Sequence, residues 1–121
     1  MCVTVLLAED AEVMRLAIRR VLDVEPGIEL LGEAVTLSQT LQMTAELKPN
    51  VVLMDLHMPG ERELSPRFIK SQLFLSTKHV LMMSVWNDEE SKALANSYGA
   101  FTLLDKSNLQ SSLVPTIMQF S

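Results

Sequence analysis

Five short apolar segments alternate with five segments of helical periodicity along this chain of 121 residues. The apolar segments are rich in β-branched residues and cover residues 3–8, 28–35, 51–55, 79–85 and 101–104. Strands that alternate with helices form a parallel sheet with right-handed crossovers, so helices cover both of its faces. The pattern therefore predicts an α/β fold, a flavodoxin-like (βα)5 three-layer sandwich whose parallel five-stranded sheet has the order 2-1-3-4-5. Glycine and two glutamates in the second strand predict that it lies at a sheet edge.

The ends of the helical segments carry residues that begin or stop helices. Asp10 is suited to cap the first helix, and Asn87 the fourth. Ser65-Pro66 predicts the start of the third helix, and Gly99 the end of the fourth. Pro115 falls inside the last helix and predicts a kink or a late restart there. The apolar face of the first helix is assigned to residues spaced three and four apart, with its arginines mostly toward solvent: Val13, Ala17, Val21 and Val24, with Leu16 and Ile18 beside them.

Composition narrows the functional class. Charged residues make up 21% of the chain and hydrophobic residues 48%, which is typical of a globular domain. The net charge of −5 argues against direct contact with nucleic acid by this domain. No apolar run approaches the length of a membrane span, and the basic flank of a signal peptide is absent. Together with Cys2 as the only cysteine, these features predict a cytoplasmic protein without a membrane partner.

Polar side chains follow four of the predicted strands, where the carboxyl ends of a parallel sheet form a ligand-binding crevice. These residues are Glu9, Asp10, Asp55, Ser84 and Lys106. Carboxylates that converge repel one another, and Mg²⁺ resolves the conflict because it prefers oxygen ligands. The expected metal ligands are Glu9, Asp10, Asp55 and the backbone carbonyl of His57. Lys106 could pair with Asp55 or with a phosphoryl oxygen.

Each of these residues also has a purely structural explanation. Glu9-Asp10 could cap a helix, Asp55 could stabilise a turn, and Ser84 could bond to the backbone. Lys106 could be a solvated loop residue. Their joint occurrence at adjacent strand ends favours function instead, because a carboxylate nucleophile, a metal, a lysine and a hydroxyl are what phosphoryl transfer requires.

The motifs that carry these residues resemble the receiver domain of bacterial two-component response regulators, in particular receivers of the LuxR/FixJ type. The motifs are Leu7-Ala8-Glu9-Asp10, the segment 51–60 (VVLMDLHMPG), Met83-Ser84 and the segment 99–106 (GAFTLLDK). The resemblance implies that Asp55 accepts a phosphoryl group from a sensor histidine kinase or a phosphotransfer protein. It also implies that Glu9 and Asp10 hold Mg²⁺, that Lys106 contacts the phosphoryl group and that Ser84 bonds it, so Asp55, Ser84 and Lys106 are the expected catalytic residues.

The resemblance sets the remaining expectations. The chain should be a single receiver domain over residues 1–121 without an output domain, and a signalling module rather than an enzyme beyond its own phosphorylation and dephosphorylation. It should act through a downstream protein partner, and formation of a homodimer stays open. Four features depart from the family pattern. Glu61-Arg62-Glu63-Leu64 follows the third strand, and Leu103 stands where an aromatic residue is usual. Val85 follows Ser84 where a small residue is usual, and Ser107 follows Lys106 where proline is frequent.

The sequence also bears on two other functional classes. Leu103, Val85 and Trp86 are compatible with a phosphorylation-independent pseudo-receiver that serves as an interaction module. A hydrolase that forms an aspartyl-phosphate is disfavoured, because such enzymes carry an Asp-x-Asp pair after the first strand and this chain has Glu9-Asp10.

Overall fold

A computed structural model describes residues 2–60 and 63–121 and contains a parallel five-stranded sheet. The strand order is β2-β1-β3-β4-β5, which confirms the predicted topology with β2 at an edge. The elements follow one another as β1 (Val3–Ala8), α1 (Glu12–Asp23), β2 (Ile28–Ala34), α2 (Leu37–Leu47), β3 (Val51–Asp55), α3 (Pro66–Leu73), β4 (His79–Ser84), α4 (Glu89–Ser97), β5 (Thr102–Asp105), the 3-10 turn η2 (Lys106–Asn108) and α5 (Leu109–Met118). The departure noted at Glu61-Arg62 lies outside the described residues.

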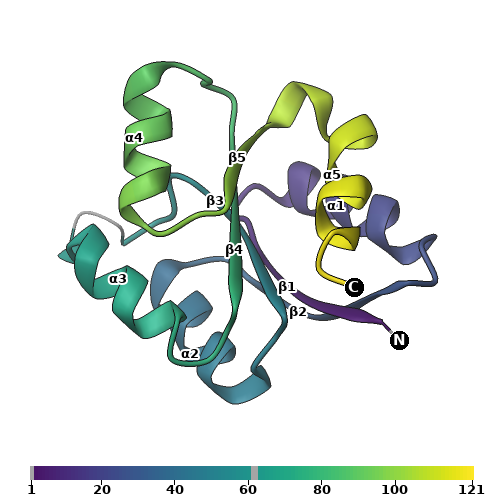
Figure 1. Ribbon diagram of the computed structural model, residues 1–121, viewed down its shortest axis with the longest axis horizontal. Helices are drawn as coiled ribbons and strands as arrows, with labels where there is room; N and C mark the ends of the chain where they lie inside the picture. Colours follow the sequence, from purple (N-terminus) through teal and green to yellow (C-terminus); the bar gives the residue numbers. More distant parts are fainter. Residues whose placement is uncertain (1, 61–62) are drawn as a thin grey trace.

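Helices cover both faces of the sheet, as Figure 1 shows: α1 and α5 lie on one side, and α2, α3 and α4 on the other. Two apolar cores result. The first joins the sheet to α1 and α5 through Ile18, Leu22, Leu113 and Ile117, and the second joins it to the other helices through Leu37, Ile69, Leu73 and Ala95. The central strand β3 is buried along its whole length because it has helices on both faces and strands on both edges.

The helix ends confirm some predictions and correct others. Ser65 caps α3 by accepting the N–H of Phe68, and Gly99 follows α4 with φ of 80°. The cap of α4 is Asp88 rather than Asn87, and its side chain accepts the N–H of Ser91. Asp10 does not cap α1: the N-cap position is Ala11, which makes no side-chain cap bond.

The predicted apolar face of α1 is confirmed at Ile18 and Val21 and wrong at Val13 and Val24. Val13 and Val24 are 83% and 81% exposed, while Ile18 and Leu22 are buried. The sequence of this helix contains two adjacent apolar stripes with the same spacing, and only contact with the sheet and α5 decides which one is buried. In and just after α3, Ile69 and Leu73 are buried, whereas Phe68 and Phe74 remain partly exposed at 45% and 38%.

Pro115 neither ends α5 nor makes it restart, because the helix runs unbroken from Leu109 to Met118. The irregular turn is instead η2, directly after β5. In the register of the sheet, Asp55 pairs with Met83 on β4, and Ser84 pairs with Asp105 on β5. The carboxyl ends of these strands therefore reach the same edge of the sheet at the same level.

Candidate functional site

Asp55 ends the central strand at the point where the chain leaves the buried core. Only 9% of the residue is exposed. Its Oδ1 accepts the backbone N–H of His57 at 3.2 Å, so the turn after β3 holds the orientation of the carboxylate. The strand is long enough to bury four apolar residues and no more, which leaves this carboxylate at the rim of the sheet.

Lys106 comes from the end of β5 and lies between two carboxylates. Its Nζ is 2.6 Å from Oε1 of Glu9 and 3.1 Å from Oδ2 of Asp55. The lysine side chain is only 10% exposed. Burial by itself would lower the pKa of this ammonium, but the hydrogen bond to Glu9 and the charges of Asp55 and Glu9 outweigh it and raise the pKa. Lys106 is therefore a charged, fixed residue of the site and not a solvated loop lysine.

Glu9 is fully buried at the end of β1. Burial raises the pKa of its carboxyl group, and the nearby charge of Asp55 raises it further, whereas Lys106 and the N–H of Ala11 act in the opposite direction. Ala11 donates that N–H to Oε2 at 3.2 Å. Apart from the ion pair with Lys106, Oε1 has no hydrogen-bond partner among the described residues. This buried oxygen is therefore suited to contact with a cation, which is the role that Lys106 has here.

Glu9, Asp10 and Asp55 bring carboxylate oxygens within 4.8 Å of one another. Glu9 forms the floor of the cluster, and Asp10 is exposed. This donor set fits Mg²⁺, which takes oxygen ligands and keeps several waters, because it combines charged oxygens with an open side. The predicted metal ligands on side chains are therefore brought together, and the fourth predicted residue, His57, is exposed beside them.

Ser84 stands at the end of β4, one strand away from Asp55, and is buried. Its Oγ accepts the N–H of Trp86 at 3.0 Å, so the hydroxyl bonds within its own loop rather than to Asp55. Val85 and Trp86 are 65% and 63% exposed. Leu103, on β5, packs against the apolar core beside α4.

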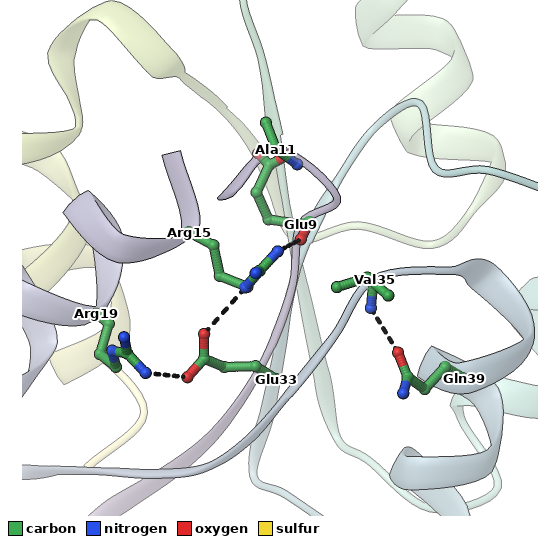
Figure 2. Close-up of polar contacts among 7 residues, drawn as sticks. All are labelled: Glu9, Ala11, Arg15, Arg19, Glu33, Val35 and Gln39. Carbon is green, nitrogen blue, oxygen red and sulfur yellow. Dashed lines mark hydrogen bonds and ion pairs between the residues drawn. The ribbon is translucent and has the colours of Figure 1, made fainter. Parts of the chain in front are cut away.

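Two residues that the sequence reading left out belong to the surroundings of the site (Figure 2). The guanidinium of Arg15 donates to the backbone carbonyl of Glu9 at 3.0 Å and lies 3.3 Å from the carboxylate of Glu33 on β2. Glu33 also binds Arg19 at 3.0 Å. The prediction that these arginines mostly face solvent is wrong for Arg15, whose side chain is 19% exposed. The available signal was a pair of arginines one helical turn apart and an acidic residue in the neighbouring edge strand.

Comparisons of the sequence with known proteins point to one protein family. The family model of the response regulator receiver domain matches residues 5–118. The nitrate/nitrite response regulator protein NarL of Escherichia coli K12 is 31% identical over 97 residues, which are 80% of this chain and 44% of that protein. The transcriptional regulatory protein LiaR of Bacillus subtilis is 28% identical over 117 residues, which are 95% of this chain and 54% of that protein. The chain thus spans about half the length of these curated relatives.

Solved structures show the same fold. A signal receiver domain from Mycobacterium tuberculosis superposes with a TM-score of 0.85 at 22% identity, covering 98% of this chain and 94% of that one. The response regulator domain of Thermotoga maritima CheB gives a TM-score of 0.83 at 22% identity, with 98% and 96% covered. Within residues 2–60 and 63–121, no helix is both long and apolar enough to cross a membrane.

Proposed function

The chain belongs to the response regulator receiver domain family of two-component systems, and on that premise we propose that it is a phosphoacceptor switch. Asp55 takes a phosphoryl group from a sensor histidine kinase or a phosphotransfer protein. The observation that carries the proposal is the position of Lys106, within 2.6 Å of Glu9 and 3.1 Å of Asp55 in a cluster of three carboxylates. Three carboxylates that converge repel one another, so the stability of the fold alone does not explain why they lie together.

The transfer forms a bond between a carboxylate oxygen of Asp55 and phosphorus while the bond from phosphorus to the donor's leaving nitrogen breaks. Asp55 is suited to this attack because the N–H of His57 fixes one oxygen and the strand holds the side chain at the sheet edge. Glu9, Asp10 and Asp55 would hold Mg²⁺, with the carbonyl of His57 as a further ligand. Charge neutralisation at the phosphoryl oxygens is the chemistry that Mg²⁺ supplies when it is bound.

Lys106 and Ser84 respond to the new group. In the unphosphorylated protein the ammonium of Lys106 neutralises Asp55. After phosphorylation it contacts a phosphoryl oxygen instead, because the phosphorylated carboxyl group no longer carries its own negative charge. Ser84 exchanges the N–H of Trp86 for a bond to the phosphoryl group, which changes the loop that carries the exposed side chains of Val85 and Trp86. A change at this loop alters the face that a downstream protein partner contacts.

The proposed setting is the cytoplasm, with a histidine kinase upstream and a protein partner downstream. The net charge of −5 makes direct contact between this domain and nucleic acid unfavourable. The domain acts as a signalling receiver and not as an enzyme with turnover on a free substrate.

The test is phosphoryl transfer from a small acyl-phosphate in the presence of Mg²⁺, followed by intact mass. The expected result is a single phosphoryl adduct that requires Mg²⁺ and is absent from Asp55→Asn. A matched control is Asp23→Asn, which makes the same chemical change at an exposed residue far from the site and should be phosphorylated normally.

Absence of an adduct both from the small donor and from histidine kinases would refute the switch. Mg²⁺ binding without phosphorylation in these assays would favour a phosphorylation-independent interaction module. An adduct that persists in Asp55→Asn would place the acceptor elsewhere.

A further inference from the structure

We propose that Arg15 is a positioning residue for the Glu9-Asp10 acid pair and that it sets the affinity and selectivity of the site for Mg²⁺. This inference rests on the proposed function, because the site must bind Mg²⁺ for the effect to be visible. Arg15 does not belong to the cluster of carboxylates. It contacts the backbone that carries two of them.

The contact is made at one particular peptide group. The carbonyl of Glu9, which accepts a hydrogen bond from Arg15 at 3.0 Å, belongs to the peptide that links Glu9 to Asp10. On the other side of the residue, the N–H of Glu9 donates to the carbonyl of Ala34 at 3.0 Å. The peptide group is planar, so a bond that holds its oxygen restrains the backbone rotation on both sides of this peptide, where the two side chains leave the chain. Arg15 therefore orients two carboxylates through one bond.

The guanidinium is itself held in place. Glu33 lies 3.3 Å from Nε of Arg15, and the fork shape of the guanidinium allows a second nitrogen to reach Glu9 at the same time (Figure 2). The backbone N–H of Arg15 also bonds to the carbonyl of Ala11 in the first turn of α1. The edge strand, the helix and the acid pair are thus connected through one partly buried side chain.

The acid pair needs this support because no hydrogen bond or ion pair to another described residue holds the side chain of Asp10. Its side chain is exposed and does not cap α1, so the backbone alone decides where its carboxylate lies. Mg²⁺ requires near-octahedral oxygen geometry at short distances, whereas Ca²⁺ accepts variable geometry at longer ones. A backbone that is free to rotate should therefore impair Mg²⁺ binding more than Ca²⁺ binding.

Charge alone predicts the opposite change in the affinity for Mg²⁺ when Arg15 is replaced. Arg15 carries a positive charge near the site, so its removal should strengthen the binding of any divalent cation if charge alone matters. Positioning predicts weaker binding and a loss of selectivity. The sign of the change therefore separates the two effects.

Arg15→Gln and Arg19→Gln form a matched pair. Both remove one positive charge from α1, and both remove a partner of Glu33. Only Arg15→Gln removes the hydrogen bond to the carbonyl of Glu9. Arg15→Lys is a third variant, which retains the charge but cannot reach Glu33 and Glu9 with a planar fork.

The experiment is a titration of each folded variant with MgCl₂ and, separately, CaCl₂, followed through the backbone amide signals of Ala11 and His57. These amides donate to Glu9 and Asp55 and report directly on the carboxylates. Arg15→Gln should raise the Kd for Mg²⁺ by about tenfold, as loss of an outer contact to metal ligands usually does. Its Kd for Ca²⁺ should rise less, so the preference for Mg²⁺ falls.

Arg19→Gln should change both constants by no more than about twofold, because exposed ion pairs contribute little. Arg15→Lys should retain a reduced preference for Mg²⁺. Equal Mg²⁺ constants for Arg15→Gln and Arg19→Gln would overturn the inference, as would tighter binding in Arg15→Gln or a full recovery in Arg15→Lys. If the unsubstituted protein binds no Mg²⁺, the metal part of the proposed function is also wrong, and the two failures are thereby distinguished.

Discussion

Replacement of Lys106 by methionine tests how far the site depends on a cation between its carboxylates. The substitution retains most of the apolar stem and removes the ammonium that lies 2.6 Å from Glu9 and 3.1 Å from Asp55. With an effective dielectric constant of about 20, these separations correspond to gross attractions of about 6 and about 5 kcal/mol. The desolvation of the three ions opposes much of this attraction, and removing one partner of a buried pair usually costs about 3–5 kcal/mol. Because Asp10 is exposed and solvent reaches this side of the site, we expect a loss at the lower end of this range, about 3 kcal/mol in the free energy of unfolding at pH 7.

The loss should depend on pH in a defined direction. Lys106 is among the groups that lower the pKa of Glu9, so in the variant this pKa lies still further above the usual 4.5. A carboxyl group whose pKa is higher in the folded than in the unfolded state contributes stability that is fully present below its unfolded pKa and is lost as the pH rises through its folded pKa. The difference between the variant and the unsubstituted protein should therefore be small at about pH 4 and should grow toward pH 7.

Urea unfolding monitored by circular dichroism at several pH values measures this difference. Lys78→Met is the control, because Lys78 is exposed and its replacement makes the same change in net charge. MgCl₂ at a hundredfold excess over the Kd should raise the free energy of unfolding of Lys106→Met by about 2.7 kcal/mol. A deficit of the same size at pH 4 and pH 7 would refute the electrostatic reasoning, since it would point to lost packing. A control that behaves like Lys106→Met would do the same.

Three further substitutions test other parts of the structure. Glu9→Gln should weaken Mg²⁺ binding. Relative to the unsubstituted protein, its free energy of unfolding should rise between about pH 4 and pH 7, because burial raises the pKa of the Glu9 carboxyl group and its charged form is disfavoured in the folded state. A relative free energy of unfolding that falls over this range in urea unfolding would contradict the direction of the pKa shift. Ser65→Ala should cost about 1 kcal/mol, because the cap bond to Phe68 is lost, and no change in the urea midpoint would show that this cap contributes nothing. Gly99→Ala should cost about 1–2 kcal/mol, because φ is 80° and the added Cβ would approach Phe74 to 2.8 Å; an unchanged thermal midpoint would mean that the end of α4 adjusts freely.

Much of the fold could be predicted because its signals are local. The alternation of apolar and periodic segments is present in the sequence itself, and handedness leaves few ways to arrange it. Asp55 illustrates the point for the site. A carboxylate directly after four apolar residues must lie where a buried strand emerges. Its place at the carboxyl end of the sheet could therefore be predicted without tertiary information. Glu9 and Lys106 follow from the same rule. The structure pairs Lys106 with Asp55, as expected, and also with Glu9, a contact that was not predicted.

Other features could not be predicted because they depend on how whole elements pack. Val13 and Ile18 belong to neighbouring stripes of α1 with equal periodicity, and contact with the sheet and α5 decided that Ile18 is buried and Val13 exposed. The cap of the same helix depended on a backbone angle at Ala11 rather than on the preference of Asp10 for cap positions. Propensity describes a residue in isolation and does not include these competing contacts.

Arg15 separates the two kinds of information most clearly. The sequence alone determined the order of the strands, the carboxylates at their ends and a lysine able to pair with Asp55, because each of these follows from local pattern and chain connectivity. Only the tertiary structure decided that the guanidinium of Arg15 lies between Glu33 and the carbonyl of Glu9. The physical reason is that a hydrogen bond from a long side chain to a backbone carbonyl leaves no mark on residue types at the acceptor, and it exists only once β1, β2 and α1 have packed together.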